Sequence, residues 1–307
     1  MSLLVVGSVA FDQIETPFGK SDKIVGGAGT YISLTSSYFT KDLGIVSVIG
    51  DDFPKEYIDL FHKKNIDTQG LEIKQGEKSF FWAGKYHNDM NSRDTLVTEL
   101  NVLENFKPVV PETFKNVDIL MLGNLSPDVQ LSVIEQMPTR PKLVVLDTMN
   151  FWMDIARADL DKVISKIDVL TINDEEARQL SGEYSLVKAA QKIIDMGPRF
   201  LIIKKGEHGA LLFNKNEVFF APALPLEEVF DPTGAGDTFA GGFVGYLAQT
   251  GNISFDNMKR AIIYGSAMAS FCVEKFGSIR IENLTDEEIN SRVQQFVDLV
   301  QFDITLA

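Results

Sequence analysis

Cysteine is nearly absent from this chain of 307 residues, since Cys272 is the only one. A single cysteine excludes an intrachain disulfide and indicates a reducing compartment. Long apolar runs are also missing, because no stretch approaches the roughly 20 apolar residues that a membrane-spanning helix needs. The short apolar run Leu3–Val6 has no basic flank, so it indicates a buried strand rather than a signal peptide. We therefore expect a cytoplasmic protein without a membrane partner.

Basic residues are too few to balance the acidic ones. The chain has 29 lysines and arginines against 43 aspartates and glutamates, a net charge of −14. This excess argues against binding to nucleic acid or to an anionic membrane surface. It does not exclude an anionic substrate, because a local site with a divalent cation can invert the field. The length is compatible with one large α/β domain or two smaller ones.

Two common phosphate-binding motifs are missing as well. No Gly-Lys-Ser or Gly-Lys-Thr triplet occurs, which excludes a Walker A loop. The pair Gly234 and Gly236 is followed by Phe239 where the third glycine of a dinucleotide fingerprint would stand. A phosphate site in this chain must therefore be of another kind.

The stretch Asp231–Asp237 is the most informative part of the sequence. Gly234 and Gly236 permit a tight turn, and apolar residues at helical spacing follow as far as Gly251. A glycine turn that opens a helix directs backbone N–H groups and the positive end of the helix dipole at one point, which is an anion site. A carboxylate at that point, Asp237, needs a further task such as accepting a proton. The pattern predicts phosphoryl transfer to a hydroxyl, and an ordinary turn with Asp237 as helix N-cap is the alternative.

Short β-branched runs alternate with amphipathic helical stretches along most of the chain. This alternation predicts βαβ units and a mostly parallel sheet with helices on both faces. Ligands gather at the carboxyl ends of the strands in such sheets. The expected strands are Leu3–Val6, Ile45–Ile49, Ile119–Leu122, Leu143–Leu146, Val169–Ile172 and Phe200–Lys204, and the expected helices lie around residues 30–40, 54–64, 128–137, 157–166, 174–181 and 185–196.

Two segments, 11–25 and 71–100, break this alternation because their patterns are extended and no helix lies between them. Paired, they would form a small sheet standing off the main domain. We interpret this sheet as a lid, and an edge sheet for dimer contact or mere decoration is the alternative. We expect a single domain over residues 1–307, and a homodimer through the lid edges stays open. The capping box Thr285–Glu288 predicts a last helix.

Two separated signatures resemble those of the PfkB, or ribokinase-like, carbohydrate kinases. The first is Gly26–Thr30 entering a helix, and the second is Asp231–Asp237, which is similar to the pattern Asp-Thr-x-Gly-Ala-Gly-Asp. The resemblance implies a ribokinase-like three-layer α/β/α fold with a mostly parallel central sheet and a small β lid. It also implies a kinase that uses ATP and Mg²⁺ to phosphorylate a hydroxyl, which we expect to be a primary alcohol, of a sugar or sugar-like small molecule.

The resemblance also assigns roles in the phosphoryl transfer. It implies a catalytic base at Asp237 and an anion hole made by Gly234, Ala235 and Gly236. In relatives, residues that match Asp231 and Thr233 often belong to a monovalent-cation site. Because Pro232 between them leaves both in place, a potassium ion is an open expectation.

For the nucleotide, Asn173 and Glu176 resemble the motif Asn-x-x-Glu, in which the glutamate holds Mg²⁺ through water; the same pair is also a capping box. The segment Lys204–Gly209 resembles the nucleotide loop, although a hairpin turn explains its glycines equally well. Ala269 and Ser278 resemble the adenine pocket, with helix packing as the alternative. The nucleotide residues implied in this way are Lys204, Gly206, Gly209, Asn173, Ala269 and Ser278.

On the acceptor side, Asp12 matches an aspartate that hydrogen-bonds sugar hydroxyls in the family, and Gly26 and Gly27 let the backbone approach the sugar. Tyr31 departs from the pattern, because many relatives have a sugar-contacting asparagine there, and this puts ribose in doubt. Asn124 follows a strand and is a further candidate, although an Asx turn explains it almost as well.

The expected lid adds Trp82, Tyr86, Asn91 and Arg93 as contacts for the acceptor, and an arginine favours a substrate that carries phosphate or carboxylate. Two other functions stay open. One is a nucleoside kinase of the adenosine-kinase type, and the other is a non-catalytic sugar-binding protein with the same fold. The intact Asp237 argues against the second, because a binding protein needs no base in an anion hole.

Overall fold

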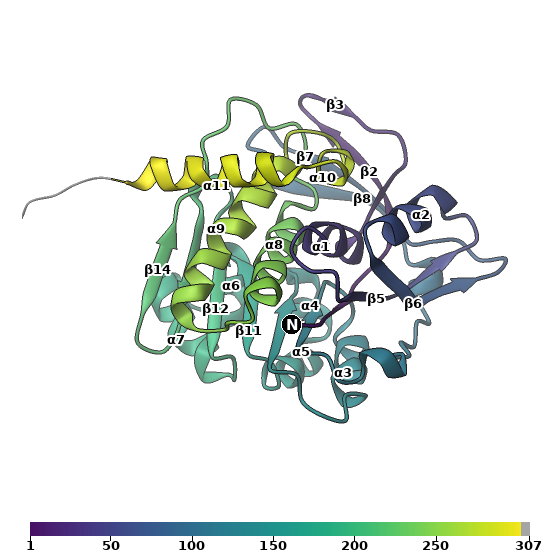
Figure 1. Cartoon of the computed structure of the whole chain (residues 1–307), viewed down its shortest axis with the longest axis horizontal. Helices are drawn as coiled ribbons and strands as arrows, with labels where there is room; N and C mark the ends of the chain where they lie inside the picture. Colours follow the sequence, from purple (N-terminus) through teal and green to yellow (C-terminus); the bar gives the residue numbers. More distant parts are fainter. Residues whose placement is uncertain (302–307) are drawn as a thin grey trace, which may run out of the picture.

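Helices cover both faces of one large mixed sheet in the computed structural model, which describes residues 1–301 (Figure 1). The nine strands follow the order β14-β13-β12-β11-β10-β9-β1-β5-β6. Neighbours from β12 to β6 along this path pair in parallel, and β13 is antiparallel to both of its neighbours. The strands are β1 (Leu3–Val6), β5 (Leu43–Gly50), β6 (Ile66–Lys74), β9 (Ile119–Leu122), β10 (Leu143–Asp147), β11 (Val169–Asn173), β12 (Phe200–Lys204), β13 (Ala210–Phe213) and β14 (Val218–Ala221).

The apolar strands are buried on both faces, as their continuous hydrophobic runs predict. In β1, Leu3 and Val5 belong to one core, and Leu4 and Val6 belong to the other. The first core packs against α1 (Ala28–Ser36), α2 (Lys55–Lys63), α8 (Ala235–Thr250), α9 (Phe255–Cys272), α10 (Ile279–Glu282) and α11 (Asp286–Val300). The second packs against α3 (Pro127–Glu135), α4 (Asn150–Ile155), α5 (Arg157–Ile164), α6 (Asp174–Ser181) and α7 (Leu186–Asp195). The expected three-layer α/β/α fold is confirmed.

A second, five-stranded sheet has the order β3-β2-β7-β8, with β4 paired to β2. Parallel pairing of β2 with β7 joins the two segments that we expected to meet. Residues 71–74 belong to β6 in the large sheet, so the second segment of the small sheet begins only at Phe81, later than we expected. Its strands are β2 (Ala10–Thr16), β3 (Gly19–Lys20), β4 (Ile24–Gly26), β7 (Phe81–Tyr86) and β8 (Arg93–Glu99). The last six residues of the expected 1–307 domain lie outside the described part.

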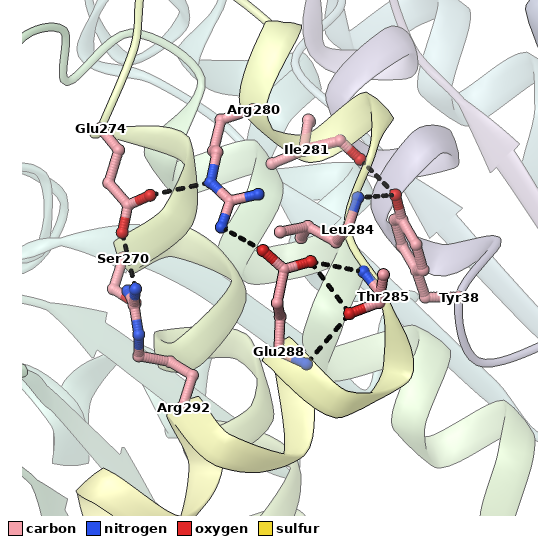
Figure 2. Close-up of polar contacts among 9 residues, drawn as sticks. All are labelled: Tyr38, Ser270, Glu274, Arg280, Ile281, Leu284, Thr285, Glu288 and Arg292. Atoms are coloured by element: carbon pink, nitrogen blue, oxygen red, sulfur yellow. Dashed lines mark hydrogen bonds and ion pairs between the residues drawn. The ribbon is translucent and has the colours of Figure 1, made fainter.

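A polar network fastens the C-terminal helices to the body of the protein (Figure 2). The hydroxyl of Tyr38 donates to the carbonyl of Ile281 at 2.6 Å and accepts from the N–H of Leu284 at 2.9 Å. It also accepts from Lys64 Nζ at 2.8 Å. One tyrosine just beyond α1 therefore holds the chain between α10 and α11.

Two arginines complete this network. Arg280 donates to Glu274 at 2.9 Å and to Glu288 at 2.7 Å, and Arg292 donates to Glu274 at 2.6 Å (Figure 2). Glu288 also accepts from the N–H of Thr285 at 2.8 Å, which closes the expected capping box of α11. No helix among residues 1–301 is both long and apolar enough to cross a membrane.

Candidate active site

The glycine turn before α8 opens that helix as the sequence predicts. Gly234 is its N-cap with φ of 75°, in the left-handed region, and Ala235 is its first residue. Asp237 lies in the first turn. The N–H groups of Gly236 and Asp237 are first-turn donors that a helix cannot pair with its own carbonyls. A carboxylate and a set of backbone donors therefore share one end of α8.

Gly234 is also the point at which Tyr31 packs against this turn. A Cβ on Gly234 would lie 2.5 Å from carbon atoms of the Tyr31 ring, so only glycine fits there. Tyr31 is buried in α1, and its hydroxyl has no hydrogen-bond partner among the described residues. The tyrosine thus supports the turn with its ring and leaves a polar atom unpaired in the interior.

An ion pair lies beside Asp237. Lys204 Nζ is 2.8 Å from Asp147 Oδ1, and a Cβ on Gly236 would lie 3.1 Å from the same nitrogen. Burial and then the charge of Asp147 raise the pKa of Asp237, Lys204 lowers it, and the net result is a pKa of about 7. The carboxyl group that would act as base therefore titrates near neutral pH.

Asn173 and Glu176 form a reciprocal capping box at the start of α6. Asn173 Oδ1 accepts from the N–H of Glu176 at 2.8 Å, and Glu176 Oε2 accepts from the N–H of Asn173 at 2.7 Å. Burial raises the pKa of Glu176 to about 7, while Lys204 lowers it. Residues 1–301 contain no cluster of three acidic, histidine or cysteine ligands. One buried carboxylate fits Mg²⁺ if phosphates and water supply most of its ligands.

The loop before the turn is pinned by a buried carboxylate. Asp231 is fully buried, and its oxygens accept from the N–H groups of Thr233 at 2.8 Å and Gly277 at 2.9 Å. Thr233 Oγ1 also donates to the hydroxyl of Tyr86 at 3.2 Å. This contact joins the small sheet to the loop that leads into α8.

Asp12 lies where β2 and β4 pair, next to the glycines predicted to contact the acceptor. A Cβ on Gly26 would lie 1.9 Å from Asp12 Oδ2, and Gly27 has φ of 91°. Burial and the charge of Asp231 raise the pKa of Asp12 to about 7, and the N–H of Gly27 and then Arg93 lower it. Arg93, at the start of β8, also lowers the pKa values of Asp237 and Glu176. Asp12 and Arg93 therefore face the same site as Asp237.

The expected nucleotide loop begins at the end of β12. Gly206 and Gly209 have φ of 54° and 88°, and Lys204 is the last residue of the strand. The loop is also a hairpin, because β12 pairs antiparallel with β13, so both interpretations of its glycines are compatible. A Cβ on Gly206 would lie 2.6 Å from the side chain of Asn91, which places the β7–β8 connection against this loop.

Three predicted contact residues are already engaged by neighbours or packed. Asn124 Oδ1 accepts from Trp152 Nε1 at 2.8 Å, and its Nδ2 donates to the Sδ of Met149 at 3.0 Å. Ser278 Oγ donates to the carboxylate of Glu282 at 2.7 Å. Ala269 packs against the first core. The side chains of Asn124 and Ser278 are therefore not free for a ligand without rearrangement.

The sequence did not reveal two contacts of this site. It placed Lys204 at the end of a strand but did not predict its ion pair across β11 with Asp147, the last residue of β10. It placed Tyr86 in the small sheet without predicting its bond to Thr233. Strand ends with opposite charges were the only signal for the first pair, and none was present for the second.

Comparison with known proteins agrees with this geometry. The family described as pfkB family carbohydrate kinase matches residues 2–284. A cytidine kinase from Thermococcus kodakarensis is 30% identical over 250 residues, which cover 80% of this chain and 87% of that protein. A ribokinase from Staphylococcus aureus is 34% identical over 279 residues, which cover 82% and 83% of the two chains.

Solved structures show the same fold. An E. coli protein described as a ribokinase II, in complex with ATP and Mg²⁺, matches with a TM-score of 0.76 and 18% identity over 96% of this chain and 99% of that one. The resemblance drawn from Gly26–Thr30 and Asp231–Asp237 is confirmed. The chain belongs to the pfkB family of carbohydrate kinases, which phosphorylate hydroxyl groups of sugars and nucleosides.

Proposed function

We propose that this protein transfers the γ-phosphoryl group of ATP to a primary hydroxyl of a small sugar or nucleoside, with Asp237 as the base. The observation that carries the proposal is the position of Asp237 in the first turn of α8, beside unpaired backbone donors and near Lys204. A purely structural N-cap does not need a buried carboxyl that titrates near neutral pH. The ATP and Mg²⁺ bound by the E. coli relative support the choice of donor.

In this mechanism the acceptor lies near Asp12, Gly26 and Gly27. Its hydroxyl oxygen attacks the γ-phosphorus, the bond to the β–γ bridging oxygen breaks, and the hydroxyl proton passes to Asp237. The N–H groups of Gly234 and Gly236 would hold the moving group, whereas the N–H of Ala235 already donates to the carbonyl of Pro232 at 3.2 Å. When bound, Mg²⁺ neutralises charge on the phosphates, and Glu176, oriented by Asn173, would hold it through water.

A nucleoside is a second candidate acceptor within the same chemistry. The relative that is 30% identical is a cytidine kinase. The small sheet also carries Trp82 and Tyr86, whose rings lie 5.7 Å and 6.0 Å from the Arg93 guanidinium. Aromatic faces of this kind suit a base as well as a sugar ring. A panel of free sugars, sugar acids, phosphorylated sugars and nucleosides, scored by ADP release, decides between the two classes.

Two further features belong to this proposal. The small sheet is a lid over the acceptor, since Tyr86 and Asn91 contact the loops around Thr233 and Gly206. The loop at Asp231 and Thr233 is the place for a potassium ion, because Asp231 is buried and both residues carry side-chain oxygen atoms. A higher turnover in potassium chloride than in sodium chloride of equal ionic strength would support the cation site. Equal rates in the two salts would remove it.

Asp237→Asn tests the proposed base because it keeps the shape and removes the proton acceptor. We expect kcat to fall by about 1000-fold, within the range that general-base removal produces. Asp128→Asn is the matched control, since Asp128 is an exposed acid in the first turn of α3 and should change nothing. A variant that kept more than about a tenth of the turnover would show that Asp237 is not the base.

A further inference from the structure

Lys204 is held at the mouth of the anion hole by a partner from another strand. Its Nζ is 2.8 Å from the carboxylate of Asp147, and these residues end β12 and β10. The two side chains are only 18% and 9% exposed. A buried ion pair adds little net stability, because desolvation offsets much of the attraction. Stability alone therefore does not explain why this ion pair lies against Gly236, and a functional role is the better explanation.

The surrounding carboxylates keep this ammonium charged. Burial alone would lower the pKa of Lys204, but Asp147, Glu176 and Asp237 together raise it above its usual value. The glycine at position 236 lets the ammonium approach the backbone donors, since a Cβ there would lie 3.1 Å from Nζ. A full positive charge and the N–H groups of the turn thus face the same small volume.

We propose that Lys204 is a catalytic residue whose ammonium binds the transferring phosphoryl group, and that Asp147 is the positioning residue that aims it. This inference rests on the proposed kinase function and adds a side-chain cation to the backbone anion hole. It differs from a general role of the Lys204–Gly209 loop along the nucleotide, because it assigns one atom, Nζ, to the group that moves.

The step balances without a proton from the lysine. The acceptor oxygen forms a bond to the γ-phosphorus, and the electron pair of the broken bond stays on the β-phosphate of ADP. The hydroxyl proton goes to Asp237. Lys204 keeps its protons and donates N–H bonds to an equatorial oxygen of the moving group, where negative charge must be stabilised. Asp147 shares the ammonium with that oxygen while the group is in transit.

Kinetics of three lysine variants test the assignment. We expect Lys204→Met to lower kcat by about 100- to 1000-fold while the KM for ATP rises less than about 10-fold, as for loss of a transition-state contact. Lys204→Arg should recover part of the rate because it keeps the charge. Lys215→Met is the matched control, since Lys215 is an exposed lysine in the turn between β13 and β14, outside the proposed site, and makes no ion pair among residues 1–301. It should stay within about 2-fold of the parent.

Asp147→Asn tests the positioning role. We expect it to lower kcat by about 10-fold, and to have no further effect in the Lys204→Met background, because it acts through the lysine. Additive losses in the double variant would overturn the positioning role. Melting temperatures of all variants separate loss of folding from loss of turnover. If Lys204→Met does not fold, the kinetics of Lys204→Arg provide the test instead.

Calorimetry gives a readout that does not depend on turnover. We expect Mg·ADP to bind the parent and Lys204→Met with affinities within about 3-fold. Aluminium fluoride together with the acceptor should tighten Mg·ADP binding in the parent, and this gain should be lost in Lys204→Met. A Lys204→Met protein that resembles Lys215→Met in both experiments overturns this inference and leaves the kinase proposal intact. A parent protein that phosphorylates no sugar or nucleoside overturns both.

Discussion

At the scale of single residues, four acids and a lysine determine the protonation states of the proposed active site. The pKa values of Asp12, Glu176 and Asp237 are each raised to about 7, in every case mainly by burial. Lys204 lowers the values of Glu176 and Asp237, and Asp147 raises them. A raised pKa means that the neutral acid is favoured, so the base at Asp237 becomes fully available only above neutral pH.

The pH profile of the reaction follows from this balance. We expect kcat/KM for the acceptor to rise with pH through a pKa of about 7, because Asp237 must be ionised to accept a proton. The charged groups that face it are Asp147 and Asp12, which raise its pKa, and Lys204 and Arg93, which lower it. Asp147→Asn removes the largest of these charges and should move the acid limb to lower pH. A limb that moves upward in that variant would contradict this electrostatic picture.

Gly234 gives a second test at this scale. Gly234→Ala adds a Cβ at 2.5 Å from the Tyr31 ring and places it in a left-handed backbone, so we expect a loss of about 2 to 4 kcal/mol in the free energy of unfolding and a large fall in kcat. Gly251→Ala, at the other end of α8, is the control. Gly251 has φ of 64° and nothing within 4 Å of its Cβ position. The difference between the two variants, in urea unfolding, measures the packing against Tyr31. Equal losses would show that backbone strain alone accounts for the effect.

At the scale of elements, the local sequence patterns predicted those strands and helix ends that residues close together in the sequence determine. The buried strands are visible as continuous apolar runs, and the capping box predicted the start of α11 at Asp286. The pattern could not show that residues 71–74 pair with β5, because an edge strand such as β6 is partly polar. The sequence analysis also missed the helix α4, because six residues are too few to show a helical period of apolar residues.

The hydrogen bonds of Tyr38 join the end of α1 to the chain between α10 and α11. Tyr38→Phe removes one hydroxyl with three partners, Lys64, Leu284 and Ile281, of which Figure 2 shows Leu284 and Ile281. We expect it to lower the free energy of unfolding by about 1 to 3 kcal/mol and to leave kcat unchanged. Tyr184→Phe is the control, because Tyr184 is 87% exposed. A change in kcat would indicate that α10 and α11 also shape the site.

At the scale of the whole molecule, the site depends on contacts between distant segments. Asp237 and its glycines are consecutive, so the sequence could predict them together. Asp147 and Lys204 are 57 residues apart in the sequence. They meet because they end β10 and β12, which lie on either side of β11 in the sheet. Their pairing follows from strand order, which no local pattern encodes. The sequence therefore predicted the residues of the site better than their partners.

The small sheet bears on the assembly of the protein. All residues of β8 are exposed, including Leu96 at 55% and Val97 at 40%. We propose that two chains associate through this edge, because an uncovered strand with apolar side chains favours pairing. Light scattering should give twice the mass of one chain, and Leu96→Glu should return the monomer while Val109→Glu, at another exposed apolar side chain, should not. A monomer in the parent protein would remove this proposal.

The contacts of the small sheet with both loops of the site have one more consequence. Asn91, in the connection between β7 and β8, lies against Gly206, and Tyr86 bonds to Thr233, so the small sheet that we propose as the lid touches the loops assigned to the nucleotide and to the turn. Ligands that share such a cover cannot bind independently. Whatever factor one substrate gains in affinity from the presence of the other, the other gains the same factor in return, because the coupling free energy is reciprocal.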